Sequence, residues 1–194
     1  MKRAEKSAET LFWPQKIEKS SNMRDTKAYF TEIIGCIISS SSSIPIVQSL
    51  MSTVRATISS EGQIFVIGNG GSMANASHFA EDLRVKYPRV LALDSIPLIS
   101  AIANDFGYEN IFVRQLTNLI KAGDLLIALS VSGNSKNIIE AVKYAESVKA
   151  NVFIFTGETG GELANRSCIK AKSKSFGIVE SLHLALLHWL SENV

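Results

Sequence analysis

The sequence predicts an α/β fold, a three-layer αβα sandwich that is built on a parallel sheet and preceded by two helices. Short apolar, β-branched runs alternate along the chain with stretches whose apolar residues recur every three or four positions. This alternation is typical of parallel βαβ units. The runs are apolar throughout rather than at every second residue, which indicates strands that are buried on both faces.

The composition is that of one globular domain. The 194 residues are 46% hydrophobic and 20% charged, which fits a soluble chain with a substantial core. The net charge of +2 has no basic stripe, and this argues against a nucleic-acid partner. No stretch approaches roughly 20 uninterrupted apolar residues, so we expect no membrane partner. Cys36 and Cys168 have no metal-ligand spacing and fit a reducing, cytoplasmic location.

The first elements of the chain are predicted to be helical. Residues 1–23 mix charges and lack a sustained apolar core, so we expect a flexible extension, with Met1 or Met23 as the start. Apolar spacing predicts helices over 25–38 and 45–58. The serine run 39–43 between them is predicted to be a flexible connector.

The rest of the chain is predicted to alternate strands with helices. Strands are expected at 63–67, 89–93, 125–130 and 151–155, and helices at 73–83, 98–104, 109–121, 136–148 and 177–191. In such sheets ligands bind outside the carboxyl ends of the strands, so the residues that follow each strand are the first candidates for a site.

The first strand end carries the sequence GNGGS, Gly68 to Ser72. Glycines let the backbone approach a ligand closely, and Ser72 can cap the next helix. A helix N-terminus attracts phosphate and other anions. An ordinary strand-to-helix turn explains the segment equally well when it is taken alone.

The next strand end carries SVSGNS, in which Ser130, Ser132 and Ser135 surround a glycine–asparagine turn. Hydroxyls and free backbone N–H groups can hold a phosphate without any lysine, whereas a capping turn alone needs only one of these serines. We therefore favour phosphate binding here. The third strand end, TGETGGEL at 156–163, fits a structural turn or a ligand contact.

Ionisable residues gather on two of the predicted helices. His78 and Asp82 have i, i+4 spacing and share one helix face, which suits a metal clip or an acid–base pair. A solvated helix face is the alternative for that spacing alone. The last helix carries Glu180, His183 and His188 among leucines, so all three histidines of the chain lie on these two helices. This distribution favours a site.

Glu180 and His188 are eight residues apart, a rise of about 12 Å along a helix. They can hardly meet on one small ligand from the same copy of the chain. Convergence becomes easier if subunits share the site, so we expect a homo-oligomer.

Five motifs in order identify a family resemblance. GNGGS…HFAEDL, AIANDFGYENIF, SVSGNS, TGETGGEL and ESLH…LH together resemble the phosphosugar isomerase (SIS) domain family, and within it the phosphoheptose isomerases. The likeness covers residue 24 to the C-terminus. It implies a single SIS domain over 24–194 with a flavodoxin-like parallel sheet. It also implies a homotetramer, with N-terminal oligomerisation helices and active sites shared between subunits.

The resemblance also implies an activity. Phosphoheptose isomerases convert sedoheptulose 7-phosphate into D-glycero-D-manno-heptose 7-phosphate for bacterial lipopolysaccharide or capsule. The alternative is a non-catalytic SIS-domain protein that binds a phosphosugar or associates with the replication initiator. Both His78 and His188 are present, which favours the enzyme because a binding scaffold has no need of that pair.

Site residues follow from the matching motif positions. The implied catalytic pair is Asp82 as base and His188 as acid. The implied substrate-binding residues are Asn69, Gly70, Gly71, Ser72, Asn104, Asp105, Ser130, Ser132, Ser135 and Glu180. Some members bind one zinc ion per active site through the positions that match His78, Asp82, Glu180 and His188. No organic cofactor is implied.

Three residues depart from the family pattern at the implied site. Asp82 stands where glutamate is usual, which withdraws the carboxylate by about an ångström, enough to cost about 100-fold in rate unless the backbone compensates. Glu180 replaces a glutamine, and Ile178 replaces an arginine. The substrate is therefore more open to change than the fold.

Overall fold

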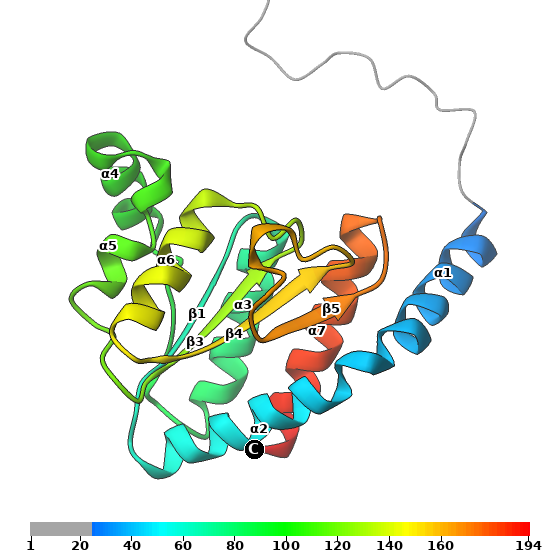
Figure 1. Cartoon of the computed structure of the whole chain (residues 1–194), viewed down its shortest axis with the longest axis horizontal. Helices are drawn as coiled ribbons and strands as arrows, with labels where there is room; N and C mark the ends of the chain where they lie inside the picture. The colour runs from blue at the N-terminus through cyan, green and yellow to red at the C-terminus, as the bar shows by residue number, and fades with distance from the viewer. Residues whose placement is uncertain (1–24) are drawn as a thin grey trace, which may run out of the picture.

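The computed structural model describes residues 25–194, which form one sheet with helices on both sides (Figure 1). The predicted flexible extension 1–23, and with it the choice of start, lies outside these described residues. The first helix, α1 (Thr26–Ser39), begins after Asp25, whose carboxylate accepts a hydrogen bond from the Lys27 N–H at 3.3 Å. Such a side chain satisfies one of the free N–H groups of a helix start.

The sheet has five parallel strands in the order β2-β1-β3-β4-β5, which is the order of flavodoxin-like domains. The strands are β1 (Ile64–Gly68), β2 (Val90–Ala92), β3 (Leu125–Ser130), β4 (Asn151–Gly157) and β5 (Cys168–Ala171). Four of them confirm the predicted runs. Every residue of β1 and β3 is buried, as expected for strands that carry helices on both faces.

The edge strand β5 was not predicted, because CIKA is short and interrupted by a lysine. The serine run explains how this edge is covered. Ser40–Ser43 forms the short helix η1, in which Ser43 Oγ accepts from the Lys170 N–H at 3.0 Å and Ser40 Oγ accepts from the Lys172 N–H at 3.0 Å. The prediction of a flexible connector was wrong, since these hydroxyls pair backbone groups that an edge strand leaves open.

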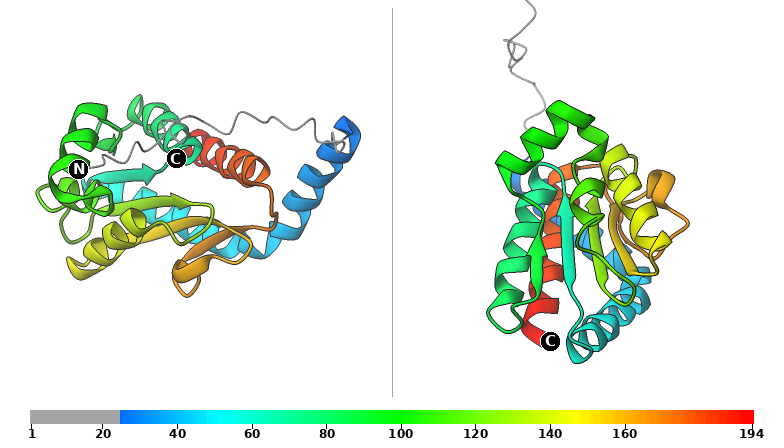
Figure 2. Two further views of the ribbon diagram at one scale, coloured as in Figure 1. Left: turned by 90° about the horizontal axis from the view of Figure 1, so that it is seen from above. Right: turned by 90° about the vertical axis from the view of Figure 1, so that its left-hand side faces the viewer.

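Helices cover both faces of the sheet, so the three-layer prediction is confirmed (Figure 2). The helices after α1 are α2 (Ile44–Ser59), α3 (Gly71–Arg84), α4 (Ile96–Phe106), α5 (Val113–Leu116), α6 (Lys136–Ser147) and α7 (Phe176–Asn193). α2, α3 and α7 pack their apolar side chains on one face, and α5, α6 and part of α4 pack on the other. α3 and α7 pack against each other, so side chains from the two helices can meet.

One predicted helix is broken in the structure. In place of a helix over 109–121 the chain forms η2 (Tyr108–Asn110) and the single turn α5. Ile111, Phe112 and Leu116 are fully buried, so helical apolar spacing here marks a core contact rather than a continuous helix.

α1 extends away from the sheet (Figure 1) and exposes Phe30, Ile34 and Ile38. By length and composition alone, Thr26–Ser59 is apolar enough to cross a membrane, which the count of uninterrupted apolar residues did not indicate. This is weak evidence, because Leu50 and Val54 of the same segment are fully buried in the core.

Candidate active site

His78, Asp82 and His188 meet where α3 and α7 lie side by side. Nε2 of His188 is 3.2 Å from Nε2 of His78. Oδ2 of Asp82 is 3.5 Å from Nε2 of His78 and 4.0 Å from Nε2 of His188. The i, i+4 spacing places His78 and Asp82 on one face of α3, and α7 supplies the second imidazole. We call these three residues the triad.

The donor atoms of the triad fit a zinc ion. A tetrahedral zinc lies 2.0–2.1 Å from its nitrogen ligands, which puts neighbouring ligand atoms about 3.4 Å apart. The three distances in the triad bracket this value. Imidazole nitrogen and carboxylate oxygen are both donors that zinc accepts. The side chains of His78, Asp82 and His188 are 51%, 36% and 42% exposed, so a fourth position is open to a substrate oxygen.

Glu180, the fourth implied ligand, does not join the triad within one chain. Its Oε1 lies 3.4 Å from Oγ of Ser72, at the start of α3. A Cβ atom on Gly71 would come within 2.5 Å of its Oε2. Two turns of α7, about 12 Å, separate Glu180 from His188, as the sequence spacing predicted.

A second cluster, the serine pocket, lies at the carboxyl ends of β1 and β3. The pocket has a volume of about 90 Å³ and is lined by Asn69, Ser72, Leu129, Ser130, Val131, Ser132, Ser135, Phe176 and Glu180. Ser130 is 4% exposed, and its Oγ has no hydrogen-bond partner among the described residues. A buried unpaired hydroxyl is costly, which points to a ligand. The volume suits one compact polar group.

The segment 156–163 supports the serine turn from outside. The Leu163 N–H donates to the Gly133 carbonyl at 3.3 Å, and the Glu162 N–H donates to Asn134 Oδ1 at 2.9 Å. Gly133 has φ +66°, and a Cβ there would collide with the carbonyl of Gly160. Of the two interpretations of this segment, these contacts favour the structural turn.

Asn69 is held by residues that the sequence did not identify. It exchanges two amide hydrogen bonds with Asn137, at 3.0 and 2.8 Å, and its Oδ1 also accepts from the Tyr108 hydroxyl at 3.0 Å. The only sequence signal was that Asn137 lies two residues after the serine turn and that Tyr108 lies inside the motif AIANDFGYENIF. Asn69 is therefore fixed at the rim of the serine pocket.

The remaining implied site residues lie outside both the triad and the serine pocket. Gly70 precedes α3 with φ +54° and open space around it. Asn104 and Asp105 are exposed on α4, where the Asn104 amide donates to Asp105 Oδ1 at 2.8 Å. Neither of these two residues lines the serine pocket within the described chain. Ile178 is buried against Cys36, so the residue that replaces an arginine serves the core.

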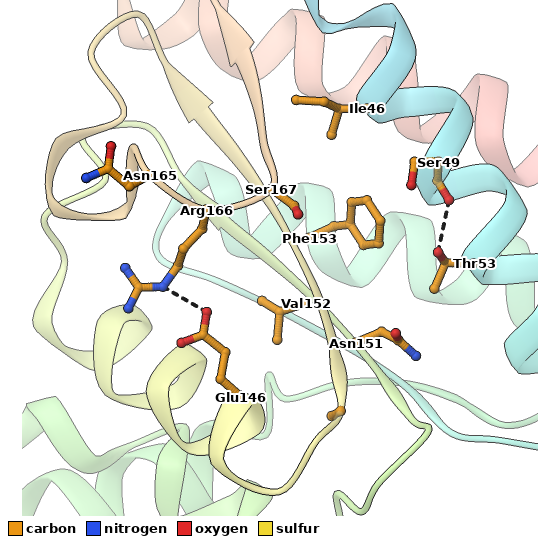
Figure 3. A pocket seen from close by; sticks show the side chains of 11 residues that line it. Ile46, Ser49, Thr53, Glu146, Asn151, Val152, Phe153, Asn165, Arg166 and Ser167 are labelled. Carbon is orange, nitrogen blue, oxygen red and sulfur yellow. Dashed lines mark hydrogen bonds and ion pairs between the residues drawn. The ribbon is translucent and has the colours of Figure 1, made fainter.

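A hollow of about 880 Å³ contains none of the implied site residues (Figure 3). It lies beside the amino end of β4, between α2 and α6. Its charged side chains, Arg166 and Glu146, pair with each other at 2.9 Å. The hollow therefore offers no reactive group comparable to the triad.

Known proteins resemble this chain in sequence and in fold. A sequence profile of the SIS domain matches residues 29–157. A probable phosphoheptose isomerase of Thermoplasma acidophilum is 36% identical over 146 residues, which cover 71% of this chain and 80% of the relative. The phosphoheptose isomerase of Histophilus somni is 29% identical over 168 residues, which cover 82% of this chain and 86% of that relative.

Solved structures agree with the sequence matches. The phosphoheptose isomerase of Neisseria gonorrhoeae superposes with a TM-score of 0.82 at 29% identity, over 86% of this chain and 94% of that chain. The phosphoheptose isomerase of Francisella tularensis gives 0.80 at 26% identity with the same coverage. The chain therefore belongs to the SIS domain family and, within it, to the phosphoheptose isomerases.

Proposed function

We propose that the protein interconverts sedoheptulose 7-phosphate and D-glycero-D-manno-heptose 7-phosphate in bacterial heptose synthesis. The observation that carries this proposal is the pairing of the triad with the serine pocket along the same two helices. One cluster offers acid–base groups, and the other offers hydroxyls at a helix start. A ligand with a phosphate at one end and a carbonyl at the other uses both when the serine pocket of one copy faces the triad of another.

The proposed reaction moves one proton between neighbouring carbons through an enediol. Asp82 takes the proton from the carbon beside the carbonyl and returns it to the former carbonyl carbon. His188 donates a proton to the carbonyl oxygen and recovers one from the neighbouring hydroxyl. His78 contacts both residues and fixes their orientation. Asp82 is one methylene shorter than the glutamate that is usual at this position, yet its carboxylate still reaches both imidazoles. We infer that the positions of α3 and α7 offset the shorter side chain.

Zinc fits the triad and belongs to this proposal as a cofactor. When bound by His78, Asp82 and His188, zinc would polarise the substrate carbonyl oxygen in place of the proton that His188 donates in the zinc-free site. Oδ2 of Asp82 faces the two imidazoles at contact distance. Its other oxygen is left for proton transfer.

We also propose a cytoplasmic homotetramer with shared active sites. The exposed side chains of Phe30, Ile34, Ile37 and Ile38 form an apolar surface on α1, and a second copy of the chain would remove it from water. Any fourth triad ligand from Glu180 would also have to come from another copy. Both cysteines are free, which suits a reducing compartment. Light scattering that gives a four-chain mass would support the assembly, and an active monomer would contradict it.

The second candidate function is binding of a phosphosugar, or association with the replication initiator, without turnover. The observation that favours it is the Glu180 carboxylate inside the serine pocket, since a negative charge there opposes phosphate. A coupled or NMR assay with sedoheptulose 7-phosphate, with added zinc and with chelator, separates the two. Turnover in either condition supports the isomerase, and binding without turnover in both supports the alternative.

A further inference from the structure

The Glu180 carboxylate lies against the first turn of α3, inside the serine pocket. Ser72 Oγ donates to its Oε1 at 3.4 Å, and its Oε2 lies 2.5 Å from the position that a Cβ on Gly71 would take. The Asn75 amide donates to the Glu180 backbone carbonyl at 2.9 Å, which fixes this turn of α7 beside α3. The contact is thus built by both helices.

This is the position that an anion prefers. The N-terminus of a helix carries a partial positive charge and free N–H groups, and it stabilises carboxylates and phosphates alike. Glu180 supplies the anion from within the chain. A phosphate that enters the pocket must compete with it for the same end of α3.

Two serine hydroxyls of the serine pocket differ in their hydrogen bonding. Ser72 is engaged by Glu180, while the buried Oγ of Ser130 has no partner among the described residues. Both side chains line the same small volume. An incoming phosphate would therefore gain Ser130 directly, but it would gain Ser72 only after the carboxylate has left.

We propose that Glu180 is a specificity-determining residue that occupies the anion position of the ligand-free pocket and must turn away before the substrate phosphate binds. This inference rests on the proposed function, since it takes the ligand to be a sugar phosphate. The carboxylate weakens binding of phosphate-bearing ligands and leaves binding of the uncharged sugar chain unchanged.

The expected size follows from Coulomb's law. Two unit negative charges about 4 Å apart in water disfavour binding by roughly fivefold, and by more at the lower effective dielectric of a pocket. A phosphate carries more than one charge near neutral pH. We therefore expect removal of the Glu180 charge to tighten phosphate binding by about tenfold.

The test compares Glu180→Gln with Glu192→Gln by calorimetry of the full-length protein in chelator. Glu192 is an exposed residue on the same helix, so its variant loses the same charge away from the pocket. The probes are inorganic phosphate, sedoheptulose 7-phosphate and unphosphorylated sedoheptulose. We expect Glu180→Gln alone to bind both phosphate-bearing probes about tenfold more tightly, with no change for the plain sugar. Unchanged or weaker phosphate binding in Glu180→Gln would overturn the inference.

The three probes separate this inference from the proposed function. Suppose that Glu180→Gln binds inorganic phosphate more tightly than the wild type does, but that the protein binds sedoheptulose 7-phosphate no more tightly than inorganic phosphate. The inference then stands and the proposed substrate fails. If the wild-type chain turns over sedoheptulose 7-phosphate and Glu180→Gln binds it no better, the inference fails and the function stands. Absence of phosphate binding in every variant overturns the inference as well.

Discussion

Nε2 of His78 on α3 and Nε2 of His188 on α7 lie 3.2 Å apart. Two imidazole nitrogens that face each other at this distance share one proton or one cation, because two lone pairs repel. Oδ2 of Asp82 lies within 4.0 Å of both and adds negative charge. The pair is therefore a candidate for both proton transfer and zinc binding.

The first prediction concerns zinc. His188→Asn removes one of the three side chains whose donor atoms converge. Loss of a residue that only hydrogen-bonds to a metal ligand already weakens metal affinity about 10- to 100-fold. We expect zinc affinity, measured by competition with a chromogenic chelator, to fall by about 100-fold or more.

Glu180→Gln is the matched comparison for that measurement. Because Glu180 contacts Ser72 rather than the triad, we expect this variant to keep the zinc affinity of the wild type. An equal loss of zinc affinity in Glu180→Gln would contradict this prediction. It would show that Glu180 of another copy binds the metal, since Glu180 does not reach the triad within one chain.

The second prediction concerns the base. Asp82→Asn keeps the size of the side chain and removes its ability to accept a proton, and general bases contribute about 10²- to 10⁴-fold to rates. We expect kcat to fall within that range. Glu81→Gln is the control, since Glu81 is the exposed neighbour and loses the same charge. Similar rates in the two variants would remove Asp82 from the mechanism.

The third prediction concerns the unpaired hydroxyl of Ser130. Ser130→Ala removes a buried hydroxyl that has no partner among the described residues of the ligand-free chain, so the free energy of unfolding should stay the same or rise. A hydrogen bond to a charged ligand contributes about 1.5–3 kcal/mol, so we expect binding of sedoheptulose 7-phosphate to weaken by about tenfold or more.

Urea unfolding and calorimetry check both halves of this prediction. Ser147→Ala, on the exposed face of α6, serves as the control. A variant that unfolds more easily yet binds equally well would assign Ser130 to the core instead of the ligand.

The fourth prediction concerns His183, which is fully buried and donates from Nε2 to the Thr156 carbonyl at 3.1 Å. Burial lowers the pKa of this imidazole from 6.5 to about 4. The unfolded chain therefore binds the extra proton first, and stability falls as the pH drops from about 6.5 to about 4. The full effect is on the order of 3 kcal/mol.

His183→Gln keeps a donor for Thr156 but does not titrate in this range. We expect the difference in urea-unfolding free energy between pH 7 and pH 5 to shrink in this variant. An unchanged pH dependence would mean that other groups, not His183, control acid sensitivity.

The local part of the site could be predicted from the sequence. His78 and Asp82 are one helical turn apart, so their spacing alone places them on one face. The serine turn likewise lies between a strand and a helix that the apolar pattern identifies. The family motifs added His188, which no local pattern connects to α3.

The long-range contacts could not be predicted in this way. The serine run meets the edge strand β5 through hydrogen bonds that span 127 and 132 residues, and no local signal marks such pairs. The Asn69–Asn137 pair spans 68 residues for the same reason. Tertiary packing decides these contacts, and it also broke the helix expected over 109–121.

The central claim is that the triad and the serine pocket together isomerise a seven-carbon sugar phosphate. The most direct measurement is NMR observation of sedoheptulose 7-phosphate mixed with the wild-type chain in deuterated water. We predict that the aldose phosphate appears, that deuterium enters at the carbon beside the carbonyl, and that Asp82→Asn slows both by about 10²- to 10⁴-fold. A wild-type chain that binds the ketose phosphate but produces neither aldose nor exchange, with zinc or without it, would contradict the account.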